Sequence, residues 1–179
     1  MIKIFLRGKY TAKHAEISDE KYNKVRHHDW YYYKGKDARV SYAYAIIEGQ
    51  RVKLHRWVTG VTDENILVDH IDHNGLNCQD DNLRLCNKSQ NGANSRKPLT
   101  FNGKKLTCEY KGVVKRTRKN GDIVYEPRLT FEGKYMHLGS YKDKVQAAIA
   151  YDIKALELWG DFALLNFPRE NYIQTEIQK

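Results

Sequence analysis

The segment from residue 109 to residue 167 has the pattern that most constrains how this chain can fold. Alternating apolar positions predict three short strands, at residues 113–118, 125–131 and 135–141. The pairs Asn120-Gly121 and Glu132-Gly133 predict the turns between them. Because strands joined by such short turns pair antiparallel, the segment predicts a three-stranded antiparallel sheet.

A helix is predicted directly after this sheet, at residues 143–159. Apolar side chains recur there at helical spacing and are expected to form its core face: Val145, Ile149, Ile153 and Leu156. Several alanines are small enough to let the helix lie close to the sheet, and Gly160 is a typical C-cap residue. The sheet and the helix together predict a domain at residues 109–168, with a loosely attached tail at residues 169–179.

The rest of the chain divides into a linker and an N-terminal domain. Residues 95–108 contain Pro98, Gly103 and four basic residues without sustained periodicity, which is typical of a linker. Residues 1–94 are predicted to form a mixed domain whose last elements are a strand at 66–71, a strand at 83–86 and a helix from Asn87 or Ser89. Residues 54–58 are compatible with either a helix or a strand, because periodicity alone does not decide.

Residues 66–96 carry the highest density of groups suited to chemistry. Asp69 and His70 end a predicted strand, Asn74-Gly75 predicts a tight turn, and Asn91 lies in the first turn of the predicted helix. In a strand–hairpin–helix unit, Asp69 and Asn91 come within reach of one cation, and their oxygens suit a hard divalent ion such as magnesium. His70 points to the opposite face of the strand, and an ordinary histidine pKa of about 6.5 suits a general base.

The order of these groups resembles the HNH nuclease motif of phage and intron-encoded homing endonucleases. The matching runs are Asp69-His70, Asp81-Asn82-Leu83-Arg84 and Ser89-Gln90-Asn91, with Asn91 in place of the final histidine. The resemblance implies an α+β chain whose N-terminal nuclease domain (residues 1–94) has a ββα-metal core at about residues 66–96.

Residue by residue, the resemblance implies His70 as general base, Asp69 and Asn91 as metal ligands, and Asn82 as the residue that orders the hairpin. His55 matches a histidine that precedes the motif and is expected to have a supporting catalytic role. The implied cofactor is one divalent ion, Mg²⁺ with Mn²⁺ as the alternative. No structural zinc is expected, because the three cysteines lack Cys-x-x-Cys spacing.

The C-terminal domain resembles the plant ethylene-response-factor (APETALA-type) DNA-binding domain. The matching residues are Tyr110-Lys111-Gly112-Val113, Leu138-Gly139-Ser140-Tyr141, Ala150-Tyr151-Asp152 and Leu165-Asn166-Phe167-Pro168. The resemblance implies that the free face of the sheet reads DNA, and arginine can pair with guanine in the major groove. Across the chain, the predicted DNA-binding residues are Arg84, Lys88, Arg96, Lys97, Lys104, Lys105, Lys115, Arg116, Arg118, Tyr125, Arg128 and His137.

The net charge favours a polyanionic partner. The chain carries +9 at pH 7, and residues 84–137 alone hold 13 Lys and Arg against 4 Asp and Glu, so the remaining charges cancel. No apolar run is long enough for a membrane span, and the first residues do not resemble an export signal. We expect double-stranded DNA as the partner, no membrane association, a monomer or weak dimer, and a cytoplasmic location in a bacterial host, with a phage- or intron-encoded gene.

These features predict a site-specific, homing-type DNA endonuclease. It would hydrolyse a phosphodiester with one metal ion and nick one strand per active site, while the C-terminal sheet reads the target. The alternative is a non-catalytic, sequence-specific DNA-binding regulator with a vestigial nuclease motif. A nuclease that acts on RNA or without sequence preference is disfavoured by the separate reader domain.

Overall fold

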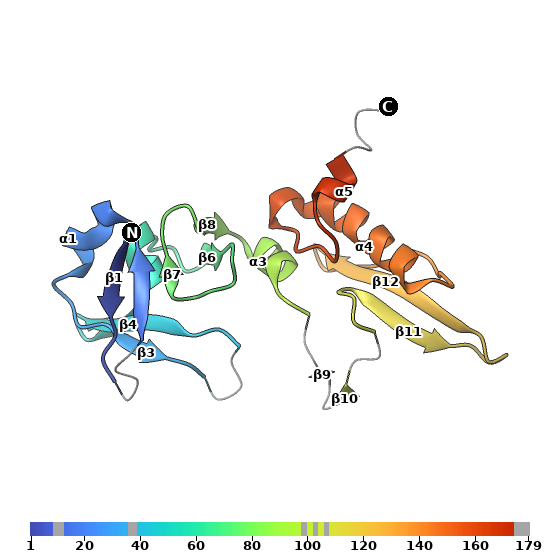
Figure 1. Ribbon diagram of the computed structural model, residues 1–179, viewed down its shortest axis with the longest axis horizontal. Helices are drawn as coiled ribbons and strands as arrows, with labels where there is room; N and C mark the ends of the chain where they lie inside the picture. Colours follow the sequence, from blue (N-terminus) through green and yellow to red (C-terminus); the bar gives the residue numbers. More distant parts are fainter. Residues whose placement is uncertain (9–12, 36–38, 98–99, 102–103, 106–107, 174–179) are drawn as a thin grey trace. The chain divides into compact units, whose positions relative to one another are not determined.

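The computed structural model describes residues 1–8, 13–35, 39–97, 100–101, 104–105 and 108–173, and the side chains of all of these except residues 100, 101, 104, 105 and 173. The chain divides into two compact units, Met1–Lys88 and Ser89–Lys179. Both combine small, mostly antiparallel sheets with a few helices, which confirms the predicted α+β class (Figure 1). Among the described residues, no helix has the length and hydrophobicity needed to cross a membrane.

The first unit is built from three small sheets, ordered β1-β2-β7, β3-β4-β5 and β6-β8 in the part that the structure describes. Their strands are β1 Ile2–Phe5, β2 His14–Ile17, β3 Tyr31–Tyr33, β4 Tyr42–Ile47, β5 Gln50–Lys53, β6 Leu67–His70, β7 Asn77–Cys78 and β8 Leu83–Cys86. The helical elements are a 3-10 turn at Asp19–Lys21, α1 at Tyr22–Val25 and α2 at Leu54–Thr59. The ambiguous segment 54–58 is therefore helical.

The two faces of β4 have different surroundings. Ala43 and Ala45 are buried in the core of the first unit, which is built around side chains such as Trp30. Tyr42 and Tyr44 alternate with these alanines, so they lie on the opposite, outward face of the sheet. Small inward residues and large outward residues thus leave an aromatic surface on this sheet.

The hairpin between β6 and β8 packs closely against the segment that leads into β4. A Cβ atom at Gly75 would overlap the backbone oxygen of Ser41 and the ring of Tyr42. The left-handed backbone conformation of this turn falls on His73, whose φ is 63°, and not on Gly75. The predicted turn at Asn74-Gly75 is present, but the glycine is needed for close approach.

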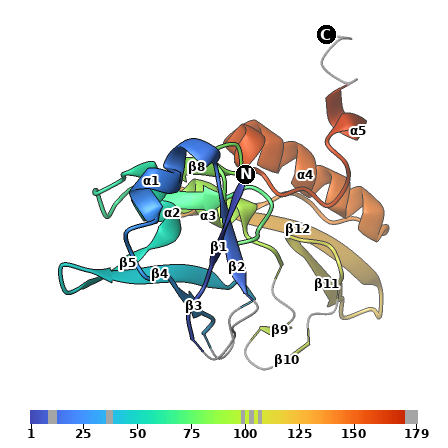
Figure 2. The same cartoon turned by 60° about the vertical axis from the view of Figure 1, so that its left-hand side comes forward.

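The second unit carries a three-stranded antiparallel sheet with the order β11-β12-β13 and one long helix, α4. Its elements are α3 Lys88–Asn94 (which starts one residue before the unit), β9 Thr100–Phe101, β10 Lys104–Lys105, β11 Val113–Thr117, β12 Ile123–Phe131, β13 Lys134–His137, α4 Lys144–Trp159, a 3-10 turn Gly160–Phe162 and α5 Glu170–Ile173. In Figures 1 and 2, α4 covers one face of this sheet. The predicted sheet and helix are confirmed.

The face of α4 that meets the sheet differs from the predicted one. Ala147, Ala148 and Ala155 are buried there, whereas Val145 is 36% exposed and Ile153 is 54% exposed. The larger apolar residues were expected in the core because they recur at helical spacing. Close packing of a helix on a sheet instead favours small side chains at the contact, which displaces the bulky ones toward solvent.

The segment after α4 is held by Asp152, a fully buried carboxylate in the middle of the helix. The backbone N–H groups of Asn166 and Phe167 donate to it at 2.8 to 3.0 Å, and the hydroxyl of Tyr172 donates at 2.8 Å. These bonds satisfy a charge that would otherwise be costly to bury. The prediction of a loose tail from residue 169 is therefore wrong as far as Tyr172. Residues 174–179 lie outside the described part.

Candidate active site

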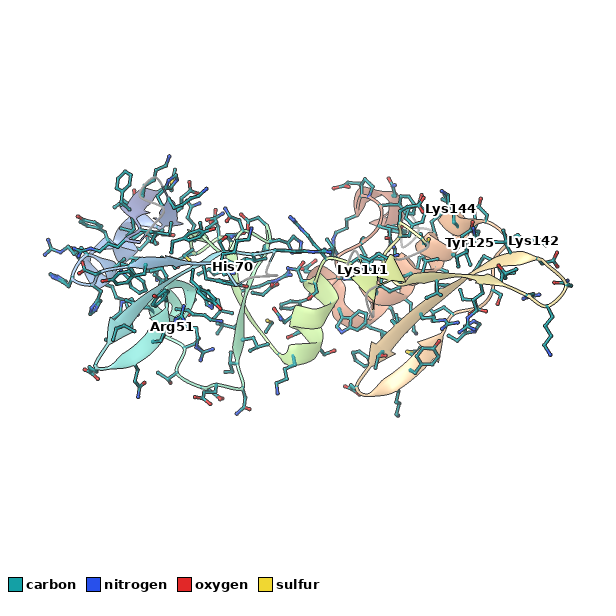
Figure 3. All side chains as sticks on the ribbon, turned by 90° about the horizontal axis from the view of Figure 1, so that it is seen from below. Arg51, His70, Lys111, Tyr125, Lys142 and Lys144 are labelled. Atoms are coloured by element: carbon teal, nitrogen blue, oxygen red, sulfur yellow. The ribbon has the colours of Figure 1, made fainter. Side chains whose placement is uncertain are left out.

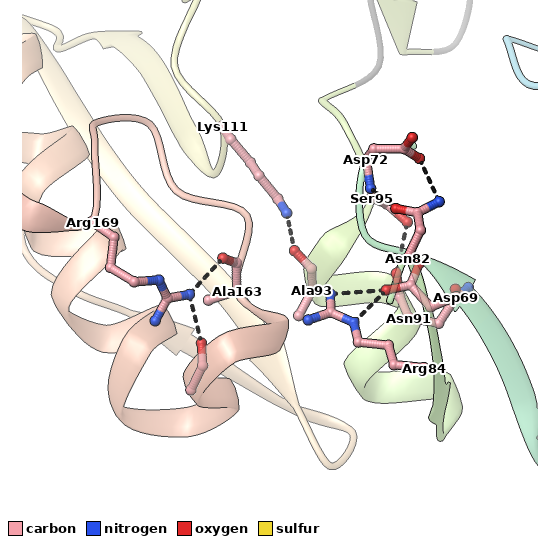
Figure 4. Close-up of polar contacts among 11 residues, drawn as sticks. Asp69, Asp72, Asn82, Arg84, Asn91, Ala93, Ser95, Lys111, Ala163 and Arg169 are labelled. Carbon is pink, nitrogen blue, oxygen red and sulfur yellow. Dashed lines mark hydrogen bonds and ion pairs between the residues drawn. The ribbon is translucent and has the colours of Figure 1, made fainter. Parts of the chain in front are cut away.

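Asp69 and His70 are neighbours in β6 and point to opposite faces of the β6–β8 sheet. The strand register places Asp69 opposite Arg84. Nε and Nη2 of Arg84 both donate to Oδ2 of Asp69, each at 2.9 Å (Figure 4). In the structure the Arg84 guanidinium fixes the Asp69 carboxylate in a largely buried, charge-assisted pair, and its predicted contact with the DNA backbone stays a prediction.

The His70 imidazole, whose position is labelled in Figure 3, is buried and contacts other rings of the first unit. Its ring centroid is 5.0 Å from that of His55 and 5.9 Å from that of Tyr42, and its Nε2 is 3.9 Å from Sγ of Cys78. Burial lowers the pKa of His70 to about 4, although two nearby aspartates act in the opposite direction. Burial, helped by the neighbouring His70, lowers the pKa of His55 to about 3. Both imidazoles are therefore neutral near pH 7, and the pKa of His70 lies below the ordinary value of about 6.5 that was expected for the general base.

Asn82 joins the two sides of the hairpin. Its Oδ1 accepts from the backbone N–H of Asp72 at 3.0 Å, and its Nδ2 donates to Oδ1 of Asp72 at 2.9 Å and to the carbonyl of Asn77 at 2.8 Å. The Asn82 side chain is buried whereas Asp72 is exposed, so these bonds are partly shielded from water. These contacts are those expected of a residue that orders the hairpin, and the catalytic assignment of Asn82 stays a prediction.

Asn91 lies in α3, which follows β8 in the chain but packs within the second unit. The indole Nε1 of Trp159 donates to Oγ of Ser89 at 2.9 Å, and the backbone N–H of Leu164 donates to the carbonyl of Ala93 at 3.1 Å. Nζ of Lys111 also donates to the Ala93 carbonyl (Figure 4). The predicted domain boundary at residue 94 therefore falls after a helix that belongs with the C-terminal unit. The pairing of Asp69 with Asn91 at one cation stays a prediction.

The donor chemistry at this site fits a hard divalent cation. Among the described residues there is no group of three or more His, Cys, Asp and Glu side chains placed to hold a metal ion. Magnesium does not require one, since it is usually bound through one or two carboxylates together with water and substrate phosphates. Asp69 supplies a carboxylate held in place by Arg84, and the amide oxygen of Asn91 is a donor of the same hard class.

The outer face of the second unit's sheet carries cations around one acid. The register pairs Arg128 with His137, and Arg116 lies on the same face. All three contact the Glu126 carboxylate, which Nε of Arg116 approaches at 3.1 Å and Nε2 of His137 at 3.8 Å, while Nη2 of Arg128 forms a hydrogen bond. These interactions, the Arg128 hydrogen bond first, lower the pKa of Glu126.

Two predicted reader residues lie on the other side of this sheet. Tyr125 packs in the helix-side core with Val113 and Ala148, and the register places Lys115 opposite Tyr125. The expectation that both lie on the free face is therefore wrong, because strand alternation directs Tyr125, like Leu129, toward α4, and Lys115 shares the face of Tyr125. Arg118 lies at the tip of the β11–β12 turn and is exposed.

The remaining basic candidates have different environments. Lys88 and Arg96 are exposed, whereas Nζ of Lys97 donates to the carbonyls of Cys108 and Tyr110, and burial lowers the pKa of Lys97. Lys97 therefore holds part of the second unit together, and its predicted DNA-binding role stays a prediction. The backbones of Lys104 and Lys105 form β10, and their side chains lie outside the described part.

Three side chains at these sites were not identified from the sequence. Tyr42 and Cys78 line the His70 ring, and Glu126 contacts Arg116, Arg128 and His137. The alternation of tyrosine and alanine in β4 was a usable signal for Tyr42. The contact of Cys78 with His70 depends on how the hairpin folds back, so no local pattern contains it.

Comparisons with known proteins agree with this geometry. A family model described as HNH endonuclease matches residues 52–93, which contain His55, Asp69, His70, Asn82 and Asn91. An uncharacterized HNH endonuclease of Acanthamoeba polyphaga mimivirus is 33% identical over 166 residues, covering 89% of this chain and 77% of the viral protein. The chain therefore belongs to the HNH endonuclease family.

The C-terminal region is similar to plant proteins over a shorter stretch. An AP2-like ethylene-responsive transcription factor of Arabidopsis thaliana is 49% identical over 41 residues, which is 23% of this chain and 10% of the plant protein. Another ethylene-responsive transcription factor of the same plant is 42% identical over 67 residues, or 36% of this chain and 15% of its own length. These partial matches support a DNA-binding domain, and DNA is the partner of this nuclease.

Proposed function

We propose that this endonuclease is a site-specific enzyme of the homing type, which nicks one strand of double-stranded DNA per active site. The observation that carries the proposal is the β6 pair, in which a carboxylate fixed by Arg84 adjoins a neutral, buried His70. Such a pair provides a metal ligand and a base within one residue of each other.

In this proposal, each side chain has a separate task. His70 accepts a proton from the water that attacks phosphorus, and the His55 and Tyr42 rings hold its imidazole in place. Asp69 and Asn91 would hold the divalent ion, Mg²⁺ or Mn²⁺. When bound, that ion supplies positive charge next to the phosphate and the departing 3′ oxygen. Asn82 keeps the hairpin in the shape that presents His70.

Target choice is assigned to the C-terminal sheet. Phosphate contacts position a protein on DNA without reading sequence, so a nuclease with a preferred site needs a second, base-reading surface. Arg116, Arg128 and His137 share the outer face of that sheet and are the proposed readers. The full dyad of Asp69 and His70 argues against the alternative of a purely regulatory DNA-binding protein.

The direct test is cleavage of a supercoiled plasmid that carries DNA flanking the gene, with magnesium present. We expect nicked circles first and a break that maps to one position in that DNA. Breaks scattered over the plasmid would contradict a homing-type enzyme, and tight binding without any cleavage in Mg²⁺ or Mn²⁺ would favour the regulator.

A further inference from the structure

The outward face of the β3–β4–β5 sheet combines aromatic rings with two cations. Strand register places Tyr31 opposite Tyr44 and Tyr44 opposite Lys53, so these side chains share one face. The guanidinium of Arg51 lies 3.8 Å from the ring centroid of Tyr44 and 4.3 Å from that of Tyr33. Stacking between two rings holds the guanidinium plane in place and leaves its edge able to bind an anion.

The charged side chains on the three strands of this face are all positive. The three strands read YYY, YAYAII and QRVK, so they contain two cations and no carboxylate. In the part of the chain that the structure describes, neither Arg51 nor Lys53 forms an ion pair with an acid, and both are exposed. Two unneutralised cations on a twisted antiparallel sheet complement a polyanion.

The same face is continuous with the candidate base. Nζ of Lys53 lies 5.1 Å from the ring centroid of Tyr42, and that ring lies 5.9 Å from the ring of His70. Figure 3 shows Arg51 and His70 within the same unit. Next to this face there is a depression of about 430 Å³, lined by His27, His28, Asp29, Tyr31, Tyr44 and Ile46. An extended ligand that reaches His70 along Tyr42 would therefore meet Lys53 and Arg51.

We propose that the outward face of the β3–β4–β5 sheet, through Arg51 and Lys53, binds the phosphate backbone of the DNA duplex beside the bond that is cut. The proposal rests on the proposed function, since it places the substrate next to His70. It adds a DNA contact within the nuclease unit, separate from the C-terminal sheet and from the basic stretch of residues 84–137. Arg51 and Lys53 would each neutralise one phosphate, while Tyr33 and Tyr44 hold the guanidinium in place.

The test is the salt dependence of binding to a short DNA duplex of arbitrary sequence, in metal-free buffer so that no cleavage is needed. We expect the double variant Arg51→Gln/Lys53→Gln to bind more weakly and to lower the slope of log K against log salt by about 2, roughly 0.9 per lost phosphate contact. The charge-preserving exchange Arg51→Lys/Lys53→Arg should keep the original slope, which separates charge from folding.

A matched control removes two charges elsewhere in the same unit. Lys24 and Arg26 lie at α1, which is at the upper side of the first unit in Figures 1 and 2 while β3 is at the lower side. Lys24→Gln/Arg26→Gln should leave the slope unchanged. The proposal would be overturned if the two double variants lowered the salt slope equally. It would also be overturned if Arg51→Gln/Lys53→Gln did not lower the slope at all. The proposal would also be overturned if Arg51→Gln/Lys53→Gln lowered the salt slope for an RNA duplex of the same length but not for the DNA duplex. Failure of cleavage in the plasmid assay would leave this binding result intact.

Discussion

Asp69 and His70 show how one residue of strand register separates two chemical environments. Asp69 contacts the guanidinium of Arg84 across the β6–β8 pair. The next side chain, His70, contacts the ring of His55 and a thiol instead. The thiol belongs to Cys78, and burial raises its pKa to about 12, so it stays protonated beside the imidazole. His70 therefore has a neutral neighbour in Cys78, and the Asp69 carboxylate has a cationic one in Arg84.

Asn82 gives the first prediction at this scale. Asn82→Ala removes three partly buried hydrogen bonds to Asp72 and Asn77, so we expect a loss of about 1–3 kcal/mol in the free energy of unfolding. Urea denaturation followed by tryptophan fluorescence measures it. A Trp159→Phe background restricts the signal to Trp30 and Trp57, which both lie in the first unit.

The control is Asn65→Ala in the same background. Asn65 also bonds an aspartate, Asp63, but this contact is exposed to water. We expect a change within about 0.5 kcal/mol. Equal effects of the two substitutions would show that Asn82 does not order the hairpin.

The buried histidines give a pH prediction for the metal-free protein. The pKa of His55 is lowered to about 3 and that of His70 to about 4, against about 6.5 when unfolded. Between pH 6.5 and about 4 the unfolded chain therefore binds protons that the folded chain does not. Stability of the first unit should be full above pH 6.5 and fall below it, by up to about 1.4 kcal/mol per pH unit for each histidine.

Urea midpoints measured from pH 7.5 down to pH 4.5 check this dependence. His55→Gln should reduce the slope of the free energy of unfolding against pH in that range, by the amount that corresponds to about one proton. Stability that is constant between pH 7 and pH 5 would show that these imidazoles are not buried in their neutral form.

At the scale of elements, local pattern predicted the position of α4 but not the face that it buries. The three strands, the turns and the start of α4 follow from glycine turn signals, alternation and the Asp143 cap, whose Oδ1 accepts from the N–H groups of Val145 and Gln146. The buried face depends on the distance between helix and sheet, which is a property of tertiary packing. Likewise, β7 pairs in parallel with β2, and no local signal specifies such a distant partner.

The prediction at the scale of elements concerns DNA binding by the β11–β12–β13 sheet. Glu126→Gln removes the acid that contacts Arg116, Arg128 and His137, so these cations become available to phosphates. We expect tighter binding to DNA of arbitrary sequence, with a salt slope steeper by up to about 1. Electrophoretic mobility shift or fluorescence anisotropy at several salt concentrations measures both.

Glu132→Gln is the matched control for that change. Glu132 lies in the β12–β13 turn of the same sheet and forms no ion pair among the described residues. It should alter binding less than Glu126→Gln does. If both substitutions strengthen binding equally, the change in net charge accounts for the effect. The Glu126 contacts then do not keep the three cations from binding phosphates.

At the scale of the whole molecule, the sequence indicated two modules but not the unit to which α3 belongs. The HNH motif runs from β6 into α3, while the contacts of Ser89 and Ala93 tie that helix to the C-terminal unit. Those contacts come from Trp159, Lys111 and Leu164, which are distant in sequence, so the motif alone could not reveal them. The helix that carries Asn91 therefore belongs to the C-terminal unit.

The most direct measurement of the central claim is magnesium-dependent nicking of the target plasmid by the full-length protein and by His70→Ala, alongside duplex binding in metal-free buffer. We expect His70→Ala to cut at least about 100-fold more slowly and to bind the duplex as tightly as the unaltered protein. Cleavage by His70→Ala at the original rate would contradict the assignment of His70 as the base of this nuclease.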